Sequence, residues 1–269
     1  MAITTLDAVI AGMRPLEPFL KVGATMEAAG VLHSLLYTAG TPGAGVAPTP
    51  GLAGAALTAY GGQIPFVNPV SGNSYLALFE GGMSALDGQL ILYDRLWHNS
   101  GIGITTTTAQ TVNSAAWPAR DRDGATDGVG VLVGLEVSSA TNNVSAITNT
   151  TMSYTNQAGT AGRTATIASF PAAAAAGTFV VFQLQAGDTG VRSIQSLTLG
   201  TSYISGTVHL VAFRQLGPAL NCGPFRGDRV DAVSSGFPRL YDNTVPCLLW
   251  LPSATTAVTI KGTFGVTQG

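Results

Sequence analysis

Short runs rich in Val, Ile, Leu and Thr follow one another along residues 89–215, separated by turn residues. Apolar and polar positions alternate clearly at Val133, Leu135 and Val137 and again over residues 208–212, which is typical of half-buried strands. Eight strands are predicted, at Gln89–Trp97, Gly103–Thr108, Val129–Ser139, Ala146–Asn156, Arg163–Ser169, Thr178–Gln185, Arg192–Leu199 and Thr207–Gln215. Because no helical pattern lies between them, the sequence predicts a mainly β fold, an antiparallel β-sandwich similar to a jelly roll.

The first 88 residues carry a different pattern. Leu6–Gly12 and Thr25–Tyr37 are predicted as short helices, the second because its apolar residues recur near one helical face and Thr25 can cap its start. Residues 38–72 then contain closely spaced Gly, Ala and Pro, with too few large apolar side chains to form a core of their own. This segment is either a disordered linker or an extended arm laid over a neighbouring subunit.

The last segment, residues 217–269, begins with loop-like sequence and ends in two predicted strands, Pro246–Leu251 and Thr255–Gly265. These strands either return to the sandwich or pair with a neighbouring subunit. We therefore expect three parts: N-terminal helices and arm in residues 1–88, a β-sandwich domain in residues 89–216, and this C-terminal extension of loop and strands.

Charged residues are scarce along the whole chain. They make up 10% of its 269 residues, where an ordinary soluble domain has about 25%, while 46% are hydrophobic and the formal net charge is −2. Lys21 and Lys261 are the two lysines. With so few charges a free monomer would expose sizeable apolar patches, so the chain is predicted to be a subunit of an assembly, a homo-oligomer with a trimer favoured. Its scattered arginines give no basic footprint for nucleic acid.

The cellular compartment follows from what the sequence lacks. It has no run of 18 consecutive apolar residues, and its N-terminus has no basic opening of a secretory signal. We therefore expect a soluble chain made without export and without a membrane partner. In a reducing cytoplasm the two cysteines, Cys222 and Cys247, would be two buried or unpaired thiols, and a disulfide closing the C-terminal segment is the alternative.

Residues that could carry chemistry are thinly spread. Asp121, Asp123 and Asp127 lie close together with glycines, but their register does not match an EF-hand calcium loop, so a solvated connection is expected. The three histidines fall on different predicted elements, and neither GxSxG nor HExxH is present. The four glutamates are too dispersed for a glycosidase pair, and the tryptophans have apolar neighbours that favour packing. We predict no catalytic residue, no cofactor and no metal.

The densest set of polar residues with a structural use is Asp94, Arg95 and His98, on and just after a predicted strand. Arg95 can form an ion pair with Asp94 or with Glu136, either across strands or across subunits. Such a pair is expected to be structural and not catalytic.

Three stretches carry a resemblance to known proteins. Residues 92–121, which begin Leu-Tyr-Asp-Arg-Leu-Trp-His-Asn-Ser-Gly-Ile and end Trp-Pro-Ala-Arg-Asp, resemble a family of tailed-bacteriophage virion proteins. Residues 161–167 and 183–192 fit the same family. The resemblance covers about residues 50–216, and it implies a structural protein encoded among head genes, with no catalytic residues to transfer.

These observations together predict a non-enzymatic virion structural protein, a capsid decoration or cement protein that is assembled in the host bacterial cytoplasm. Its expected partners are the major capsid protein or other virion subunits. The alternatives are a tail, collar or fibre-adaptor protein and a host receptor- or glycan-binding module. Contacts with partners are predicted for Leu32, Leu36, Leu52, Leu57, Tyr60, Ile64, Phe66 and Arg95.

Overall fold

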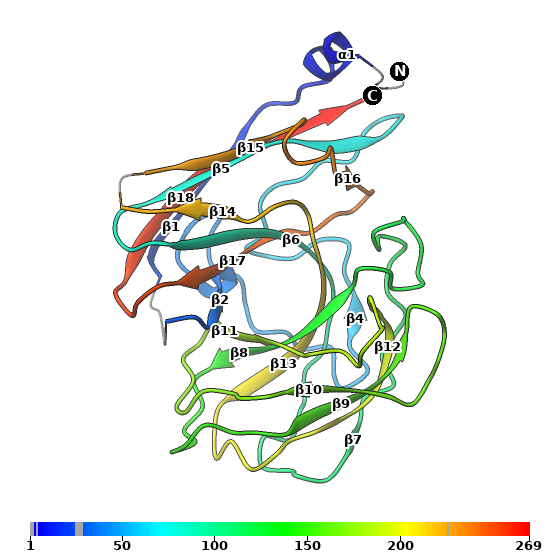
Figure 1. The fold of residues 1–269 in the computed structure, drawn as a ribbon, viewed down its shortest axis with the longest axis vertical. Coiled ribbons are helices and arrows are strands. Elements are labelled where there is room, and N and C mark those ends of the chain that lie inside the picture. Colours follow the sequence, from blue (N-terminus) through cyan, green and yellow to red (C-terminus); the bar gives the residue numbers. More distant parts are fainter. Residues whose placement is uncertain (1–2, 4, 25–28, 225) are drawn as a thin grey trace. The chain divides into compact units, whose positions relative to one another are not determined.

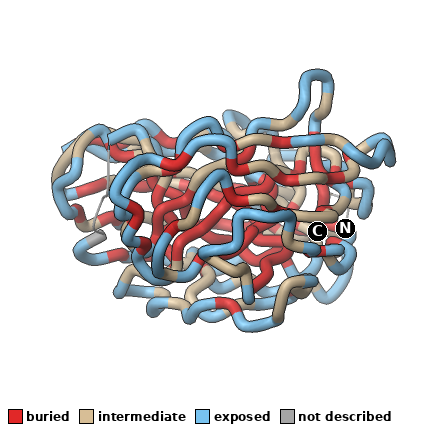
Figure 2. The backbone as a smooth tube through the Cα atoms, turned by 90° about the horizontal axis from the view of Figure 1, so that it is seen from below, coloured by how far each residue is buried: buried red, intermediate tan, exposed pale blue. Residues whose placement is uncertain are grey.

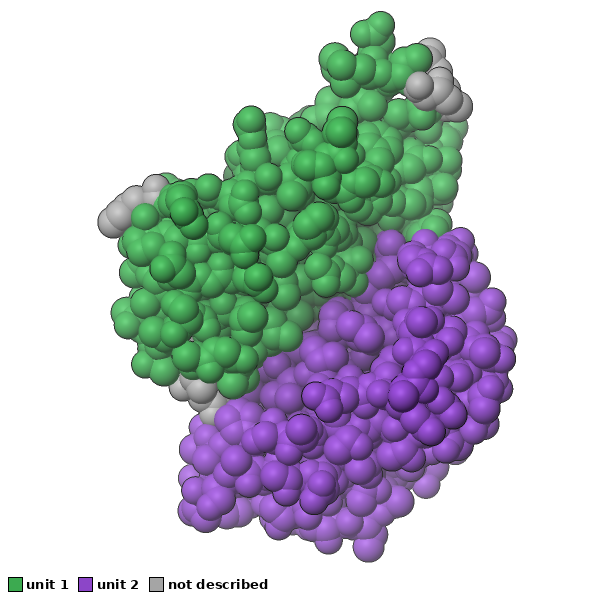
Figure 3. Space-filling view, in the orientation of Figure 1, with its two compact units in different colours: residues 1–46, 58–94, 215–269 green, residues 47–57, 95–214 purple. Residues whose placement is uncertain are grey.

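The structure, a computed structural model, describes residues 3, 5–24, 29–224 and 226–269. Its fold is mainly β and antiparallel, as predicted. The chain divides into two compact units, each built from separate stretches of sequence (Figure 3). Unit 1 comprises residues 1–46, 58–94 and 215–269, and unit 2 comprises residues 47–57 and 95–214. The chain therefore enters unit 2 twice, the second time within strand β6 (Gly88–His98).

One sheet of unit 1 has the strand order β15-β5-β18-β1-β3, with β16 also paired to β5 (Figure 1). Its strands are β1 (Glu17–Ala24), β3 (Gly40–Thr41), β5 (Ser74–Met83), β15 (Asp228–Asp231), β16 (Arg239–Leu240) and β18 (Val258–Gln268). The long central ladder of β5 with β18 runs from the pair Met83–Ile260 to the pair Ser74–Gln268. Because buried residues alternate with less buried ones along most of β5, one face of this sheet packs on a core and the other faces outward.

A second group of strands in unit 1 contributes to the same core. Strand β17 (Pro246–Pro252) pairs with β2 (Leu32–Ser34) and with the first half of β6, and β14 (Leu220–Cys222) also pairs with β6. The core takes large buried side chains from both groups, among them Phe19, Phe79, Leu90, Leu248, Trp250, Ile260 and Phe264. Both predicted C-terminal strands are thus present as β17 and β18, and in this unit they pair with strands formed by the first 94 residues.

Unit 2 is a sandwich of two antiparallel groups. In the first, β8 (Leu132–Ser139) pairs with β13 (Thr207–Gln215) and β11 (Thr178–Val181), and β4 (Ala55–Ala56) pairs with the end of β6. The second is a sheet in the order β10 (Arg163–Ile167), β9 (Thr150–Asn156), β12 (Val191–Thr198) and β7 (Gln110–Thr111). Alternate residues of both groups meet in one core, including Val133, Leu135, Val137, Met152, Tyr154, Ile194, Val208 and Leu210. Figure 2 shows buried stretches of the chain in red in the interior, with exposed loops in pale blue around them.

Two predicted elements are wrong. The helix expected over Thr25–Tyr37 is absent from residues 29–37, since Leu32–Ser34 forms β2 and Leu35–Tyr37 a 3-10 helix, while residues 25–28 lie outside the described part of the chain. Gly103–Thr108 is a loop and not a strand. Its backbone is held by the side chain of Gln110, whose Oε1 accepts from Gly103 N (2.6 Å) and whose Nε2 donates to Gly103 O (3.0 Å). A side-chain amide thus replaces a ladder partner.

The first predicted helix is present as α1 (Leu6–Ala11), and residues 38–72 are extended and irregular. In this structure the segment packs on its own chain. Within unit 1, Ile64 N donates to Pro246 O (2.9 Å), and within unit 2, Leu57 N donates to Leu96 O (2.9 Å). Backbone groups that lack a regular ladder thus find partners along the segment. No helix in the described residues is long and apolar enough to cross a membrane.

Candidate functional site

The residues predicted to contact partners lie mostly in the interior of the chain. Leu36, Leu57, Ile64 and Arg95 are buried, and Leu32, Leu52, Tyr60 and Phe66 are partly buried. The side chains from Leu32 to Phe66 could contact a partner only if residues 32–66 detached from the rest of their own chain. Contacts of all the predicted residues with other subunits remain a prediction, and the large apolar side chains that are exposed belong to other residues.

Exposed apolar side chains concentrate at the N-terminus of unit 1. Six of the twelve exposed large hydrophobic residues in the described part of the chain fall within residues 6–22. They are Leu6, Ile10, Met13, Leu16, Leu20 and Val22, which we call the N-terminal stripe. Leu6 is 68% exposed and Ile10 63%, and their spacing of four residues places both on one face of α1. A concentration of this kind marks a contact surface more than isolated exposed residues do.

Helix α1 is attached to unit 1 through hydrogen bonds accepted by the carbonyl groups of its last turn, and the side chains of Leu6 and Ile10 stay exposed. Its start is capped by Thr5, whose Oγ1 accepts from Ala8 N (3.2 Å). Thr267 Oγ1 donates to Val9 O (2.8 Å), and Gln268 N donates to Gly12 O (2.9 Å), which holds the helix at the end of β18 (Figure 1). A Cβ on Gly12 would lie 2.4 Å from Gln268 O, so only glycine allows this approach.

The stripe continues onto the outward face of the sheet in unit 1. The register places Pro18, Thr263, Glu80 and Arg229 side by side across β1, β18, β5 and β15. The next outward row holds Leu20, Lys261 and Gly82 in the same order. Since successive residues of a strand point to opposite faces, these two rows form one surface.

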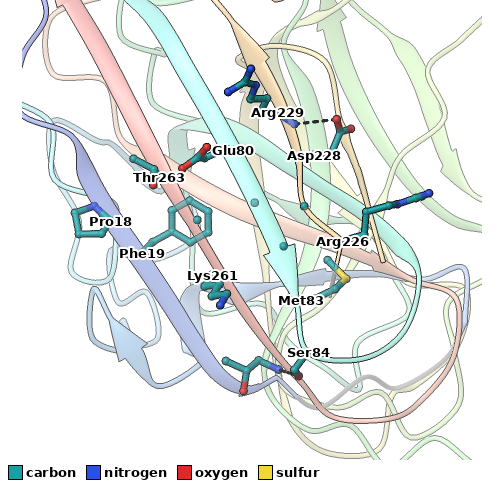
Figure 4. Close-up of a pocket in the computed structure, with 15 residues that line it drawn as sticks. Pro18, Phe19, Glu80, Met83, Ser84, Arg226, Asp228, Arg229, Lys261 and Thr263 are labelled. Carbon is teal, nitrogen blue, oxygen red and sulfur yellow. Dashed lines mark hydrogen bonds between the residues drawn. The ribbon is translucent and has the colours of Figure 1, made fainter. Parts of the chain in front are cut away.

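A shallow groove of about 910 Å³ crosses this surface (Figure 4). Gly82 and Gly227 leave its floor without side chains, and a Cβ on Gly82 would lie 3.4 Å from Gly227 Cα. Lys261, Arg226, Arg229, Glu80 and Asp228 supply charges of both signs to its lining. Asp228 is already engaged, because its Oδ2 accepts from Asn221 N and its Oδ1 from Arg229 N, both at 2.8 Å. The groove has neither histidine nor cysteine among its described lining residues.

The polar residues predicted around Arg95 form a buried cluster in unit 2. Arg95 donates to both carboxylate oxygens of Glu136, at 2.9 and 2.6 Å, and both side chains are fully buried. Arg95 Nε also donates to His98 Nδ1 (3.2 Å). Burial, and after it the Arg95 charge, lowers the pKa of His98 to about 3. Of the two partners considered for Arg95, Glu136 forms the ion pair, while Asp94 accepts from Val245 N in unit 1 (2.8 Å).

The aspartate cluster after Arg120 is organised by one carboxylate. Asp121 is buried and accepts four backbone N–H groups, from Asp123 and Ala125 at Oδ1 and from Gly128 and Val129 at Oδ2. The hydrogen bonds that the Asp121 carboxylate accepts therefore stabilise the conformation of the loop formed by residues 121–129. Within the described ranges, no group of three or more His, Cys, Asp and Glu side chains could hold a metal ion.

The cysteines and tryptophans are interior residues. Cys222 and Cys247 are both buried and are not joined to each other. Burial raises the pKa of the Cys222 thiol to about 11, and its Sγ donates to Gly81 O (3.3 Å). Trp97 and Trp117 pack edge to face in the core of unit 2 at 5.2 Å, and Trp250 is buried in unit 1. None of the three tryptophans presents a ring to a glycan at the surface.

Comparison with known proteins gives no family for this chain. No protein-family model matches it, and no curated protein matches it. Among solved structures, the VP2 subviral particle of infectious bursal disease virus is similar at 15% identity over 97% of this chain and 68% of that chain, with a TM-score of 0.23. The Gt strain of the same virus gives 12% identity over 96% and 81%, with a TM-score of 0.21. TM-scores this low establish no shared fold. The bacteriophage family suggested by the sequence receives no support from these comparisons.

Proposed function

We propose that the chain is a non-enzymatic structural subunit of a virion, and within that class a bacteriophage capsid decoration or cement protein that stabilises the head through contacts between subunits. The N-terminal stripe is the observation that carries the proposal. Six large apolar side chains are exposed within 17 residues. Charged residues make up only 10% of the chain, so there is little charge repulsion to oppose association. Each such side chain contributes about 1.5–3 kcal/mol when it is fully buried, so a partner that covers the stripe gains several kcal/mol.

Two further observations support the proposal. The groove beside the stripe carries charges of both signs. This fits a protein partner whose surface, like that of this chain, carries little net charge. The sequence stretches that resemble tailed-bacteriophage virion proteins point to the same class of protein. The major capsid protein or another virion subunit is then the partner.

Substitution of the stripe tests this function directly. Replacing both Leu6 and Ile10 by glutamine removes the two most exposed apolar side chains of α1 and should weaken attachment of the purified protein to particles by about tenfold or more. The matched control is glutamine in place of the fully exposed Val70 and of Val233, which lie outside the stripe. Co-sedimentation with particles measures both. Equal attachment of the two double variants would refute the proposal.

Copy number distinguishes a cement protein from a tail, collar or fibre-adaptor protein. Densitometry of purified virions against the major capsid protein should give hundreds of copies for a decoration protein, and about six to eighteen for a component of a closed tail ring. Electron cryomicroscopy should place the protein at regular positions on the head. Density confined to the tail vertex would overturn the decoration assignment and favour the second class.

A host receptor- or glycan-binding module is less well supported, because all three tryptophans that could form a sugar platform are buried.

A further inference from the structure

A serine and a histidine in unit 2 lie in the geometry of a nucleophile and its base. Ser138 Oγ on β8 is 2.7 Å from His209 Nε2 on β13. His209 is fully buried, whereas Ser138 is partly exposed. Ser138 also lies in a bulge, because Val137 pairs with Val208 and Ser139 with Thr207 while no residue of β13 pairs with Ser138. Bulges of this kind redirect a side chain and often lie beside functional groups.

The second ring nitrogen fixes which way this hydrogen bond runs. His209 Nδ1 is 2.8 Å from Asn99 O, and a carbonyl oxygen can only accept. The proton of the neutral ring is therefore on Nδ1, which leaves a lone pair on Nε2. Ser138 then donates its hydroxyl proton to Nε2, so the serine and the base are aligned for proton transfer.

The carbonyl that orients His209 is itself held firmly. Asn99 N donates to Leu210 O (3.1 Å), and Asn99 Oδ1 accepts from Leu210 N (2.8 Å). Asn99 Nδ2 donates to Leu52 O (3.2 Å). These bonds hold Asn99 beside the strand that carries His209, so the ring has a fixed orienting partner, the third member that activated nucleophiles require.

We propose that Ser138 is a base-activated nucleophile and a site of covalent acylation, which takes acyl or phosphonyl groups from small activated donors such as esters and fluorophosphonates. Ser138 Oγ attacks the electrophilic carbon or phosphorus and forms the new bond to it. The bond to the leaving group breaks, so that an alkoxide or fluoride departs with its electron pair. The hydroxyl proton passes to His209 Nε2 and from there to solvent or to the departing alkoxide.

The charged and titratable groups around His209 are compatible with this role. Burial lowers its pKa, which keeps the ring neutral and able to accept a proton at pH 7; the nearby Glu136 charge acts in the opposite direction, and the Arg95 charge in the same direction as burial. His98 is the other histidine of this cluster and is held neutral by the same surroundings. The rate of reaction should therefore be constant above neutral pH and fall as His209 becomes protonated in acid.

A fluorophosphonate–biotin probe on the full-length protein tests the site. We expect one labelled residue, mapped to Ser138 by mass spectrometry of the peptides, and loss of the label in Ser138→Ala. Ser139→Ala is the matched control, because Ser139 is the next residue and is more exposed, and it should label like the wild type. His209→Gln keeps a possible donor to Asn99 O but removes the base, and should lower the rate about 100-fold. Absence of label, or equal labelling of Ser138→Ala, would overturn the proposal.

A cysteine exchange gives a second test that does not depend on how His209→Gln folds. In Ser138→Cys the imidazole should accept the thiol proton as the sulfur attacks, so alkylation by iodoacetamide at pH 6.5 should be at least about tenfold faster than in Ser139→Cys. Greater exposure cannot explain this order, since residue 139 is the more exposed of the two. Equal rates, or a faster reaction at residue 139, would show that His209 does not activate its neighbour.

Discussion

The ion pair between Arg95 and Glu136 gives the sharpest prediction about stability. Both side chains are fully buried, and two hydrogen bonds of 2.9 and 2.6 Å join them. In Glu136→Gln the shape is kept, but the Arg95 charge loses the carboxylate with which it forms its ion pair. Breaking a buried pair by removing one partner costs about 3–5 kcal/mol, because a desolvated charge remains. That is a large share of the about 5–15 kcal/mol by which a typical domain is stable.

Urea unfolding followed by tryptophan fluorescence measures this cost, since Trp97 and Trp117 lie in the core of the same unit. The matched control is Asp123→Asn, which breaks the Arg122–Asp123 pair, whose side chains are 66% and 56% exposed. Exposed pairs contribute about 0–1 kcal/mol, so this variant should unfold almost like the wild type. A third variant, Arg95→Met with Glu136→Leu, removes both charges and should recover most of the loss.

The result that would refute this reasoning is a Glu136→Gln variant as stable as Asp123→Asn. The Arg95 charge would then be solvated or compensated by other groups, and the burial of the pair would not determine the stability of unit 2. A double variant no more stable than Glu136→Gln would show that the loss comes from packing and not from the unpaired charge.

Two further outcomes are expected. His98 has a pKa of about 3 in the folded protein but an ordinary value near 6.5 when unfolded, so its contribution to stability is constant above pH 6.5 and is lost as pH falls from there toward 3, by at most about 1.4 kcal/mol per pH unit. Urea unfolding at pH 7.5, 6 and 4.5 should therefore show a shallower decline of the unfolding free energy in His98→Asn than in the wild type. An equally steep decline in both would contradict this. Lys21→Met should lower the free energy of unfolding by about 1–3 kcal/mol and open residues 38–43 to limited proteolysis, because Lys21 Nζ donates to Thr38 O (3.2 Å) and Pro42 O (2.8 Å). If the variant resists proteolysis like the wild type, these two hydrogen bonds do not hold the segment in place.

The sequence was most informative where apolar residues alternate. Val133, Leu135 and Val137 predicted β8 correctly because one face of that strand is buried and periodicity reports burial directly. It was least informative for β5, which contains Gly81 and Gly82 and for which no strand was predicted. The structure gives the reason for one glycine, since a Cβ on Gly81 would lie 2.7 Å from the side chain of Leu90. The requirement for glycine at position 81 comes from a side chain of the neighbouring strand β6, so no pattern in the residues around Gly81 reveals it.

Candidate site residues divide in the same way. Pairing of Arg95 with Glu136 could be suggested from the sequence because few partners exist, but choosing between Asp94 and Glu136 required the register of the strands. Ser138 and His209 could not be connected at all. Their contact depends on a bulge in β8, and a bulge shifts register without a signature in the residues themselves.

Strand β1 shows most clearly how a non-local contact determines the surface. Its register buries Phe19 and Lys21 and turns Leu20 and Val22 outward, whereas the usual preference would expose the lysine and bury the two aliphatic residues. Backbone carbonyls of residues 38 and 42 accept from the buried ammonium, and Phe19 stacks on Phe79 with ring centroids 6.2 Å apart. These contacts hold the strand in the register that exposes apolar side chains to water, and that exposure is offset only when a partner covers the N-terminal stripe. The buried lysine therefore connects the fold of unit 1 to the assembly role that we propose for it.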